Sequence, residues 1–522
     1  MDVGNTWMTK GEMLINELAQ IYSGKRYHRI HLDKLEDYHL FFEHSDFISN
    51  TRIMPISDID GSLKALRPDV TLSIINRCDD KLKRQENLFY IEDVYREDRH
   101  TNGSSVIKQL GVEILDKKNK VDVKDILNLA AESLHKIDTK ATLVISDMDI
   151  TVGILQGIED DNLREQVADE FSKKASDNIL ALTGNELIAG LPKNVGSANE
   201  VYKKFDEQGL EGELISKLNR LRQLAEQIKN ENPGLDVIID LSMINDIGYY
   251  SGIIFKGYVH NVREEVLSGG RYDNTLEKFG KSMSGVGFAI YIDCIEEKQM
   301  KTAEDLVIAM PKGRLADKVI KLFDEAGYKL DNDDNSRKLI KECNGIRYLF
   351  VKPSDVHIYV ERGIADIGII GKDILLENDP SVYELADLGI GKCILAVATK
   401  KDENLEGLEE YRVASTFVNS TKKYFVNKNI RTEVIKLSGS VEVAPLLELS
   451  DMIVDLVETG NTLRANGLEI REKIADISAR FIANKNSYVF KRDRIEKMLQ
   501  SSLIFGDLSE ERMTYLSGYG EA

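Results

Sequence analysis

Hydrophobic and polar positions divide the chain into two halves with different patterns. The second half repeats short apolar runs followed by amphipathic stretches, as in "LVIAMPKGRL", "ADIGIIGKDILLE" and "CILAVATKK". Strands that are buried on both faces read as continuous apolar runs, and helices between them cover the sheet. The pattern therefore predicts an α/β domain with much parallel sheet.

The first half has a different periodicity. The segments "NLFYIEDVYRED" and "GYYSGIIFKGYV" carry alternating or aromatic β patterns, which are typical of antiparallel strands. Between them, "DDNLREQVADEFSKKASDNILALTG" and "LISKLNRLRQLAEQIKNENPG" have apolar residues at helical spacing, and the second ends at Asn232-Pro233-Gly234. We expect an α+β domain, an antiparallel sheet with a helical insertion.

A polar stretch without apolar periodicity, "EEKQMKTAED" at 296–305, separates the two halves. A chain of 522 residues is also too long for one ordinary hydrophobic core. We therefore expect one domain over residues 1–298 and a second over 304–522.

Charge and composition narrow the functional classes. The formal net charge of -19 disfavours non-specific nucleic-acid binding, although cations focused in a cleft still allow a small anionic ligand. No apolar run reaches the roughly 18 residues of a membrane span, and the N-terminus lacks the apolar centre of a secretory signal. We expect a soluble, cytoplasmic protein without a membrane partner. The four cysteines are scattered, which predicts reduced core residues and no structural metal or disulfide.

One strand in the second half runs directly into a chemically rich turn, "DMIVDLVETGNTLRANG". Thr459, Gly460, Asn461 and Thr462 offer backbone N–H groups, two hydroxyls and a helix N-terminus, which together suit a phosphate. Asp455 and Glu458 would accept hydrogen bonds from two vicinal ribose hydroxyls. The stretch predicts a ribose 5-phosphate site, although a capped helix with solvent-facing carboxylates remains an alternative.

Cations follow other predicted strands of the same half. They are Lys312 and Arg314 around Gly313, the pair Arg337 and Lys338, and Lys352. In open α/β sheets, ligands bind outside the carboxyl ends of the strands. Any one group reads as a solvated face, but together they indicate a ligand with many negative charges.

From Leu306 to about Leu499 the chain resembles the short form of ATP phosphoribosyltransferase. The shared motifs, in order, are "PKGRL", "SRKLI", "KPSDVHIYVERGIADIGIIGKDILLE", "YELADLGIGKC", "VIKLSGSVEVAPLL", "DLVETGNTLRANGL" and "ISARFIANK". The resemblance implies a fold like type II periplasmic binding proteins, two α/β lobes around a cleft. Lobe I would span about 304–395 plus 481–505, and lobe II about 396–480.

The resemblance also implies the reaction, the first step of L-histidine biosynthesis. Adenine N1 of ATP attacks C1 of phosphoribosyl pyrophosphate and displaces pyrophosphate, with Mg²⁺ accompanying the diphosphate and no protein cage for the ion. Arg314, Arg337 and Lys338 would be the catalytic cations. The substrate-binding set would be Lys312, Gly313, Ser440, Asp455, Glu458, Thr459, Gly460, Asn461 and Thr462.

Two other classes of protein are disfavoured for this half. Type I phosphoribosyltransferases also combine carboxylates with Thr-Gly, but the Pro-Lys-Gly-Arg strand end and "SGSVEVAPLL" do not belong to their pattern. A solute-binding protein of the same fold is disfavoured by the missing export signal and by the intact ribose-phosphate residues.

The first half, from about residue 9 to 293, resembles the catalytic core of histidyl-tRNA synthetase. The motifs are "KALRPDVTLSIINR", "YIEDVYRED", "KQLGVEILD", "DIGYYSGIIFKGYV" and "LSGGRYDNTLEKFG". The resemblance implies the class II synthetase antiparallel sheet. It also implies a histidine pocket made of Asp69, Thr71, Arg96, Gln109, Glu113, Tyr249 and Tyr250.

Three departures argue against aminoacylation. Asn245 stands where synthetases place an arginine before Tyr249, and the arginine expected within "GVGFAIYIDCI" is missing, with Asp293 and Cys294 nearby. No anticodon-binding domain follows. The half resembles the regulatory subunit of short ATP phosphoribosyltransferases, here fused to its catalytic partner. That implies activation, feedback inhibition by L-histidine and a homo-oligomer. A structural scaffold without ligand and a residual histidine-activating synthetase remain alternatives.

Overall fold

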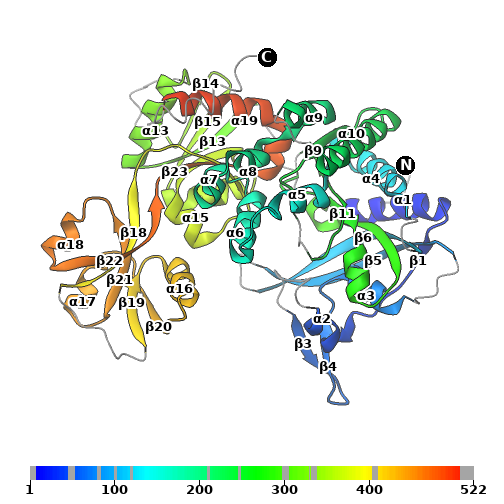
Figure 1. The fold of residues 1–522 in the computed structure, drawn as a ribbon, viewed down its shortest axis with the longest axis horizontal. Coiled ribbons are helices and arrows are strands. Elements are labelled where there is room, and N and C mark those ends of the chain that lie inside the picture. The colour runs from blue at the N-terminus through cyan, green and yellow to red at the C-terminus, as the bar shows by residue number, and fades with distance from the viewer. Residues whose placement is uncertain are drawn as a thin grey trace. The chain divides into compact units, whose positions relative to one another are not determined.

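The computed structural model describes most of the chain. The described residues are 8–44, 53–78, 84–98, 103–117, 121–207, 212–244, 248–260, 262–296, 305–328, 330, 338–401 and 410–505. The chain folds into two compact units, Met1–Thr302 and Ala303–Ala522. We call them the N-terminal unit and the C-terminal unit and describe each by itself (Figure 1).

A nine-stranded sheet forms the centre of the N-terminal unit. In spatial order its strands are β1 (His28–Arg29), β5 (Glu86–Asp98), β6 (Gly103–Lys117), β12 (Met283–Tyr291), β11 (Leu267–Arg271), β10 (Ile253–Val259), β7 (Ala141–Asp147), β9 (Asp236–Asp240) and β8 (Val195–Gly196). Every pairing from β5 through β7 is antiparallel, while β1 with β5 and β7 with β9 are parallel. A smaller sheet holds β2 (Leu35–Asp37), β4 (Leu63–Leu66) and β3 (Met54–Ser57). The antiparallel core agrees with the alternating pattern of these segments.

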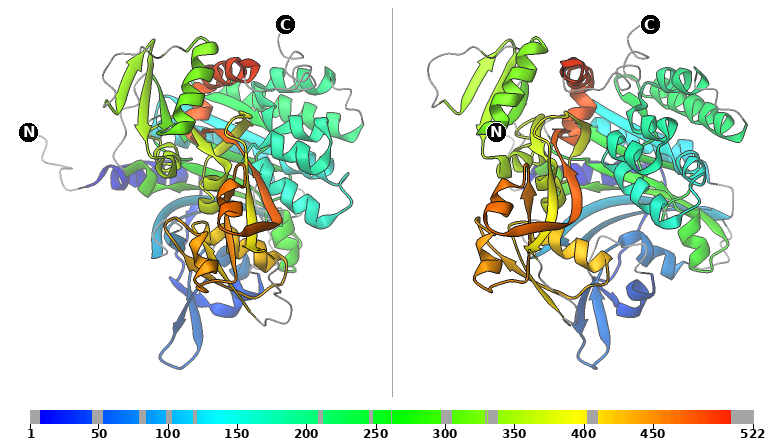
Figure 2. Two further views of the ribbon diagram at one scale, coloured as in Figure 1. Left: turned by 90° about the vertical axis from the view of Figure 1, so that its left-hand side faces the viewer. Right: turned by 60° about the vertical axis from the view of Figure 1, so that its left-hand side comes forward.

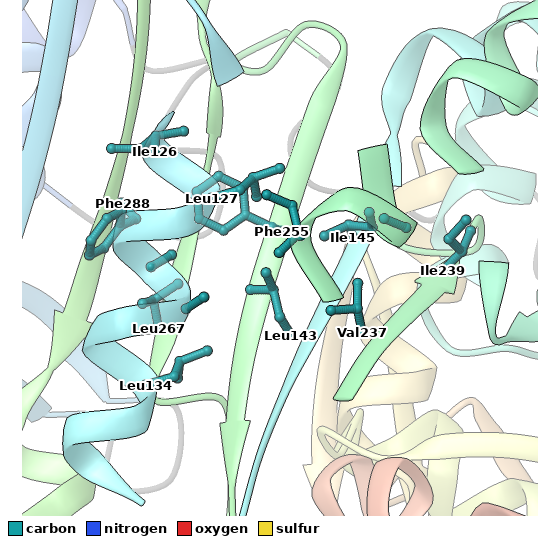
Figure 3. Packing of buried hydrophobic residues seen from close by; sticks show 14 of the residues in the cluster. Ile126, Leu127, Leu134, Leu143, Ile145, Val237, Ile239, Phe255, Leu267 and Phe288 are labelled. Carbon is teal, nitrogen blue, oxygen red and sulfur yellow. The ribbon is translucent and has the colours of Figure 1, made fainter. Parts of the chain in front are cut away.

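The N-terminal unit also contains a set of helices. They are α1 (Lys10–Gly24), α2 (Tyr38–Glu43), α3 (Val70–Arg77), α4 (Val123–Ile137), α5 (Met148–Leu155), α6 (Asp161–Ser172), α7 (Ser176–Thr183), α8 (Glu186–Gly190), η2 (Leu191–Lys193), α9 (Ala198–Glu207), α10 (Glu213–Glu231), α11 (Asp273–Lys278) and α12 (Ile292–Glu296). The apolar face of α4, with Leu127 and Leu134, packs on sheet residues such as Leu143, Phe255 and Phe288 (Figure 3). This packing buries the main core of the unit.

The predicted helical insertion is divided by a buried cation. Helix α6 ends at Ser172 and α7 begins at Ser176, with Lys174 between them at a φ of 58°. Lys174 is 2% exposed, and its Nζ lies 2.7 Å from Asp240 Oδ2 and 3.2 Å from the carbonyl oxygen of Pro192. Because a buried charge needs a partner, the left-handed turn that aims Lys174 at Asp240 interrupts the helix. Helix α10 ends at Glu231, just before the predicted Asn232-Pro233-Gly234 terminator.

The C-terminal unit contains two sheets. The first has the order β14 (Ile340–Cys343), β15 (Ile346–Val351), β13 (Leu306–Pro311), β16 (Ile367–Gly371), β23 (Ala479–Ala483) and β17 (Tyr383–Asp387). The second has the order β20 (Thr432–Lys436), β19 (Tyr411–Ser415), β21 (Met452–Val457), β18 (Cys393–Lys400) and β22 (Leu468–Ile477). The helices are α13 (Arg314–Glu325), η3 (Pro353–Asp355), α14 (Val356–Glu361), α15 (Lys372–Asn378), α16 (Val418–Asn427), α17 (Val443–Leu446), α18 (Asn461–Ala465) and α19 (Lys485–Phe505). We call the part around the first sheet lobe I and the part around the second lobe II.

The chain crosses between the lobes twice, at neighbouring places. It enters lobe II at Cys393 and leaves it at Ile477, and these two residues are paired across β18 and β22. Strand β23 of lobe I then begins at Ala479, opposite Gly371 at the end of β16. Figures 1 and 2 show β18 and the run from β22 into β23 side by side. We call this pair of crossings the hinge.

Each of the four cysteines is half-buried and packs against one of the hydrophobic cores, in keeping with the expected core positions. Within the described ranges, no helix is both long and apolar enough to cross a bilayer.

Candidate functional site

The turn after β21 has the geometry that its sequence indicated. Gly460 takes a φ of 70°, a left-handed conformation that glycine adopts without strain, and α18 begins at the next residue. Arg464 Nη2 donates to the carbonyl oxygen of Thr459 at 2.8 Å and to Asn461 Oδ1 at 2.7 Å, which holds the turn from inside the short helix. Glu458, Thr459, Asn461 and Thr462 are exposed. The hydroxyls of Thr459 and Thr462 and the carboxylate of Glu458 are therefore accessible to a ligand, while Asn461 Oδ1 already accepts from Arg464.

Asp455 lies deeper on the same strand. Its Oδ1 accepts the N–H of Leu456 at 2.8 Å, and the side chain is half-buried. Burial raises the pKa of Asp455, and the negative charge of Glu442 raises it further. Glu442, which precedes α17, is a neighbour that the sequence did not indicate, because it is brought near only by the fold.

Parallel pairing places Ser440 at the same sheet edge as this turn. Strands β20, β19 and β21 run parallel, so their carboxyl ends share one edge of lobe II. Ser440 follows β20, is exposed and has a φ of 48°. The N-terminus of α16 follows β19 and lies between Ser440 and Thr459 along that edge.

Lysines gather at the corresponding edge of lobe I. Lys312 follows β13 and donates its N–H to the carbonyl oxygen of Val351 at 2.9 Å, while Lys352 follows the parallel strand β15. Lys338 precedes β14, which is antiparallel to β15, so Lys338 also lies at this edge. All three lysine side chains are exposed. The structure thus brings separate cationic motifs to one edge.

Two predicted cations cannot be placed in full. Arg314 is the first residue of α13, directly after Gly313 at a φ of 88°, but its side chain is outside the described part of the structure. Arg337 lies outside the described residues. Their proposed roles stay predictions.

The hinge lies beside both edges. Val457, at the end of β21, pairs with Ile394 at the start of β18, and Lys372 donates its N–H to the carbonyl oxygen of Ser478 at 3.0 Å. The site residues of the two lobes therefore flank the same crossing segments. Buried ion pairs occupy this region, with Lys372 Nζ 2.6 Å from Glu384 Oε2 and Arg480 Nη1 3.2 Å from Asp387 Oδ2. The sequence contained no signal for these pairs, since isolated charges in strands read as surface.

In the N-terminal unit, one cavity collects all the residues predicted for the histidine pocket. They come from α3, β5, β6 and the segment before β10, and they are Asp69, Thr71, Arg96, Gln109, Glu113, Tyr249 and Tyr250. Tyr90, Ser268, Tyr272, Gly287 and Tyr291 also line it. Tyr272 could have been predicted as a pocket residue from the sequence, because it belongs to the motif "LSGGRYDNTLEKFG".

Glu113 is a buried carboxylate that lines this cavity. Its carboxylate is 1% exposed and accepts hydrogen bonds from the Thr71 hydroxyl at 2.7 Å and the Tyr272 hydroxyl at 2.7 Å. Gly287 lies so close that a Cβ there would be 1.9 Å from Glu113 Oε2. Burial raises the pKa of Glu113 to about 8, against the lowering effect of the two hydroxyls and with a further rise from Asp69. Burial thus disfavours the charged form of this carboxyl in the free pocket.

Arg96 and a second carboxylate, Asp69, also line the cavity. Asp69 Oδ1 caps α3 through the N–H of Leu72 at 2.9 Å and accepts from the Tyr249 hydroxyl at 3.3 Å. Arg96 Nη2 lies 3.9 Å from Asp69 Oδ2, and Arg96 is one-third exposed. The cavity therefore presents two carboxyl groups and one guanidinium, a set that suits a small amphoteric molecule.

The raised pKa of Glu113 predicts a pH-dependent stability. Because the native state holds this proton more tightly than the unfolded chain, the stability it contributes is complete below about pH 4.5 and is lost as pH rises to about 8. The neutral variant Glu113→Gln lacks this loss. Its free energy of unfolding relative to the native protein should rise by about 1.4 kcal/mol per pH unit in that window and stay constant above it. Denaturant unfolding at several pH values measures the difference, and a flat difference would contradict a buried, proton-binding Glu113.

The synthetase departures are partly visible. Asp293 Oδ2 accepts the N–H of Lys108 at 2.6 Å, so this carboxylate ties α12 to β6, and Cys294 is half-buried. Asn245 lies outside the described residues.

Comparisons with known proteins agree with this division. A family model described as histidyl-tRNA synthetase matches residues 1–295, and one described as ATP phosphoribosyltransferase matches residues 352–502. The ATP phosphoribosyltransferase of Clostridioides difficile (strain 630) is 52% identical over 198 residues, which cover 37% of this chain and 95% of that protein. That of Brachyspira hyodysenteriae is 53% identical over 199 residues, 37% of this chain and 96% of that protein.

Solved structures were also found. The ATP phosphoribosyl transferase (HisG:HisZ) complex from Thermotoga maritima has 34% identity and covers 38% of this chain and 98% of that chain, with a TM-score of 0.36. An ATP phosphoribosyltransferase regulatory subunit/histidyl-tRNA synthetase from Bacillus halodurans has 18% identity and covers 67% of this chain and 97% of that chain, with a TM-score of 0.48.

The C-terminal part of the chain thus defines a phosphoribosyl-transferring enzyme. The chain belongs to the ATP phosphoribosyltransferase family, joined in one polypeptide to an N-terminal half of the histidyl-tRNA synthetase family.

Proposed function

We propose that the C-terminal unit transfers the phosphoribosyl group of phosphoribosyl pyrophosphate to ATP, and that the N-terminal unit activates it and binds L-histidine as a feedback inhibitor. For the transferase, the carrying observation is high identity over nearly the whole length of curated relatives. The regulatory part is supported by the single cavity in which all the predicted pocket residues meet.

The reaction requires alignment and charge neutralisation. In our proposal N1 of adenine, a neutral nitrogen with a free lone pair, attacks C1 of the ribose. The new N1–C1 bond forms as the C1–O bond to pyrophosphate breaks, and pyrophosphate departs with both electrons of that bond. No general base has to remove a proton before the attack. Catalysis then consists of holding two reactants in line and stabilising the leaving group.

In this scheme the sheet edge of each lobe binds a different part of the reactants. The turn at Thr459–Thr462 binds the ribose 5-phosphate through its hydroxyls, its N–H groups and the start of α18, while Asp455 and Glu458 accept from the ribose hydroxyls. Lys312 and Lys338, with Arg314 and Arg337, neutralise the diphosphate and the ATP phosphates. Guanidinium groups suit the departing pyrophosphate because their fork matches phosphate oxygens.

Mg²⁺ enters this proposal with the diphosphate substrate. Among the described residues there is no group of three or more His, Cys, Asp or Glu side chains placed to hold a metal ion. We therefore assign the ion to the substrate, where it offsets charge on the leaving group.

The C-terminal fold is proposed to be of the type II periplasmic-binding kind, with the ligands between the lobes. The two sheets joined by paired crossings support this. We also propose that the chain forms a homo-oligomer, as the resemblance implies.

Histidine suits the N-terminal cavity chemically. Arg96 matches its carboxylate, and Asp69 and Glu113 match its ammonium and imidazole N–H groups. Fusion keeps this pocket at high effective concentration relative to the transferase. Inhibition then requires that histidine bind one state of the assembly more tightly, and the coupling must be reciprocal with substrate binding.

Release of pyrophosphate from ATP and phosphoribosyl pyrophosphate by the full chain, with and without L-histidine, tests both parts. We expect release that histidine suppresses. If histidine does not change the rate of release and calorimetry detects no histidine binding, the transferase assignment would stand. The scaffold interpretation of the N-terminal unit would then be favoured. Absence of release would contradict the transferase assignment.

A further inference from the structure

Helix α16 begins without a capping side chain of its own. Its N-cap residue is Phe417, which has no hydrogen-bonding group to offer the first free N–H groups of the helix. Those N–H groups belong to Asn419 and Ser420. The helix start lies on the lobe II edge that carries Ser440 and the turn at Thr459. A cap supplied from elsewhere would therefore act next to the proposed phosphate site.

The cap comes from lobe I. Glu377, near the end of α15, accepts the N–H of Asn419 on Oε1 at 3.0 Å and the N–H of Ser420 on Oε2 at 2.9 Å. Oε2 also accepts the Ser420 hydroxyl at 2.9 Å, and Asn419 Nδ2 donates to the backbone carbonyl oxygen of Glu377 at 3.0 Å. The carboxylate also meets the positive end of the helix dipole. Glu377 is half-buried, and α15 packs on both α16 and β22.

This contact spans the hinge. Helix α15 starts at Lys372, directly after β16 at the edge of lobe I near the lysines, and α16 starts at the edge of lobe II near Thr459. One residue thus joins the two edges that have to hold different reactants. The hinge strands and the bidentate contact of Glu377 are separate connections between the lobes, since the carboxylate binds a helix start that is not part of the crossing strands.

We propose that Glu377 is a positioning residue for the phosphoribosyl transfer: its carboxylate clamps the start of α16 and sets the alignment of the two lobes. The inference rests on the proposed function of the C-terminal unit. Glu377 touches neither reactant in this scheme. Its effect is on the geometry in which the adenine N1 meets the ribose C1, and small misplacements of reacting atoms are costly to turnover.

The expected signature is a loss of kcat and not of binding. Glu377→Ala should lower kcat by roughly 5- to 30-fold, with the KM of either substrate changed by less than about threefold. Glu377→Gln keeps an oxygen that accepts hydrogen bonds but loses the charge, so its kcat should lie between that of the native protein and that of Glu377→Ala. Asn378→Ala is the matched control, because among the described residues the partner of Asn378 Nδ2 is in its own helix, the carbonyl oxygen of Ile374 at 2.9 Å.

A double-mutant cycle with Ser420→Ala separates the clamp from general destabilisation. Ser420→Ala should lower kcat in the native background and have no further effect beside Glu377→Ala. Additive losses, a loss in KM alone, or an equal loss in Asn378→Ala would overturn the inference.

Hydrogen exchange tests the clamp without turnover. The amides of Asn419 and Ser420 should exchange at least about tenfold faster in Glu377→Ala than in the native protein, and unchanged protection would overturn the proposal. Native protein that releases no pyrophosphate, with exchange altered as expected, would count against the proposed function and leave the clamp in place. Native release with an unchanged kcat in Glu377→Ala would count against the positioning role alone.

Discussion

Replacing Thr459 and Thr462 together with valine is expected to lower kcat/KM for phosphoribosyl pyrophosphate by roughly 10²- to 10⁴-fold. Both hydroxyls are exposed at the turn between β21 and α18, where we place the 5-phosphate. Each hydrogen bond to a charged group contributes about 1.5–3 kcal/mol, so two contribute about 3–6 kcal/mol. Valine keeps the β-branched shape, and exposed positions tolerate it, so the thermal unfolding temperature should change little.

Thr432→Val is the matched control for this experiment. Thr432 begins β20, and the starts of β20, β19 and β21 lie at the opposite edge of lobe II from the turn. Steady-state kinetics at varied phosphoribosyl pyrophosphate should show no loss for this variant. Full kcat/KM in the double variant, or an equal loss in the control, would remove the phosphate assignment from the turn.

Glu113→Gln is expected to raise the histidine concentration for half-inhibition by roughly 10- to 100-fold. Hydrogen bonds from a cationic or N–H-bearing ligand can offset the desolvation cost of the native carboxylate. A buried hydrogen bond to a charged group contributes about 1.5–3 kcal/mol. The amide can accept from only one side and carries no charge. The same change should stabilise the unliganded protein near pH 8, because it removes a carboxyl whose pKa burial raises to about 8.

A Glu113→Gln variant that is more stable than the native protein but binds histidine more weakly would indicate that Glu113 has a binding role and not a structural one. A structural Glu113 would give a less stable variant. Glu86→Gln, at an exposed position of β5, is the control and should alter neither histidine inhibition nor unfolding. Inhibition of the Glu113→Gln variant at native histidine concentrations would contradict the proposed pocket. Calorimetric titration with L-histidine gives the same comparison without the enzyme assay.

Local chemistry explains what could be predicted. The turn at Thr459–Thr462 is continuous in the chain, so strand, glycine, hydroxyls and helix start are all visible in a short stretch of letters. The two halves were visible because buried parallel strands and half-exposed antiparallel strands have different periodicities. The helical insertion was predicted, but its break at Lys174 was not, because the partner Asp240 is distant in sequence.

The contacts of Glu113 inside its cavity could not be predicted from the sequence. The resemblance supplied the predicted pocket residues, but neither the approach of Gly287 nor the hydroxyl of Tyr272 on Glu113 followed from it. Both depend on the register of β12 beside β6, where Gly287 pairs with Glu113.

By itself, the sequence determined the two-part organisation, the class of each half and the phosphate-like turn, because each depends on periodicity or on residues adjacent in the chain. Only the tertiary structure decided that lysines after different strands share one edge, that both edges meet the hinge, and that Glu377 caps a helix of the other lobe. These relations depend on strand order, register and burial. Such long-range contacts arise when the chain buries its apolar faces, and no local pattern specifies which distant partner a charged side chain will meet.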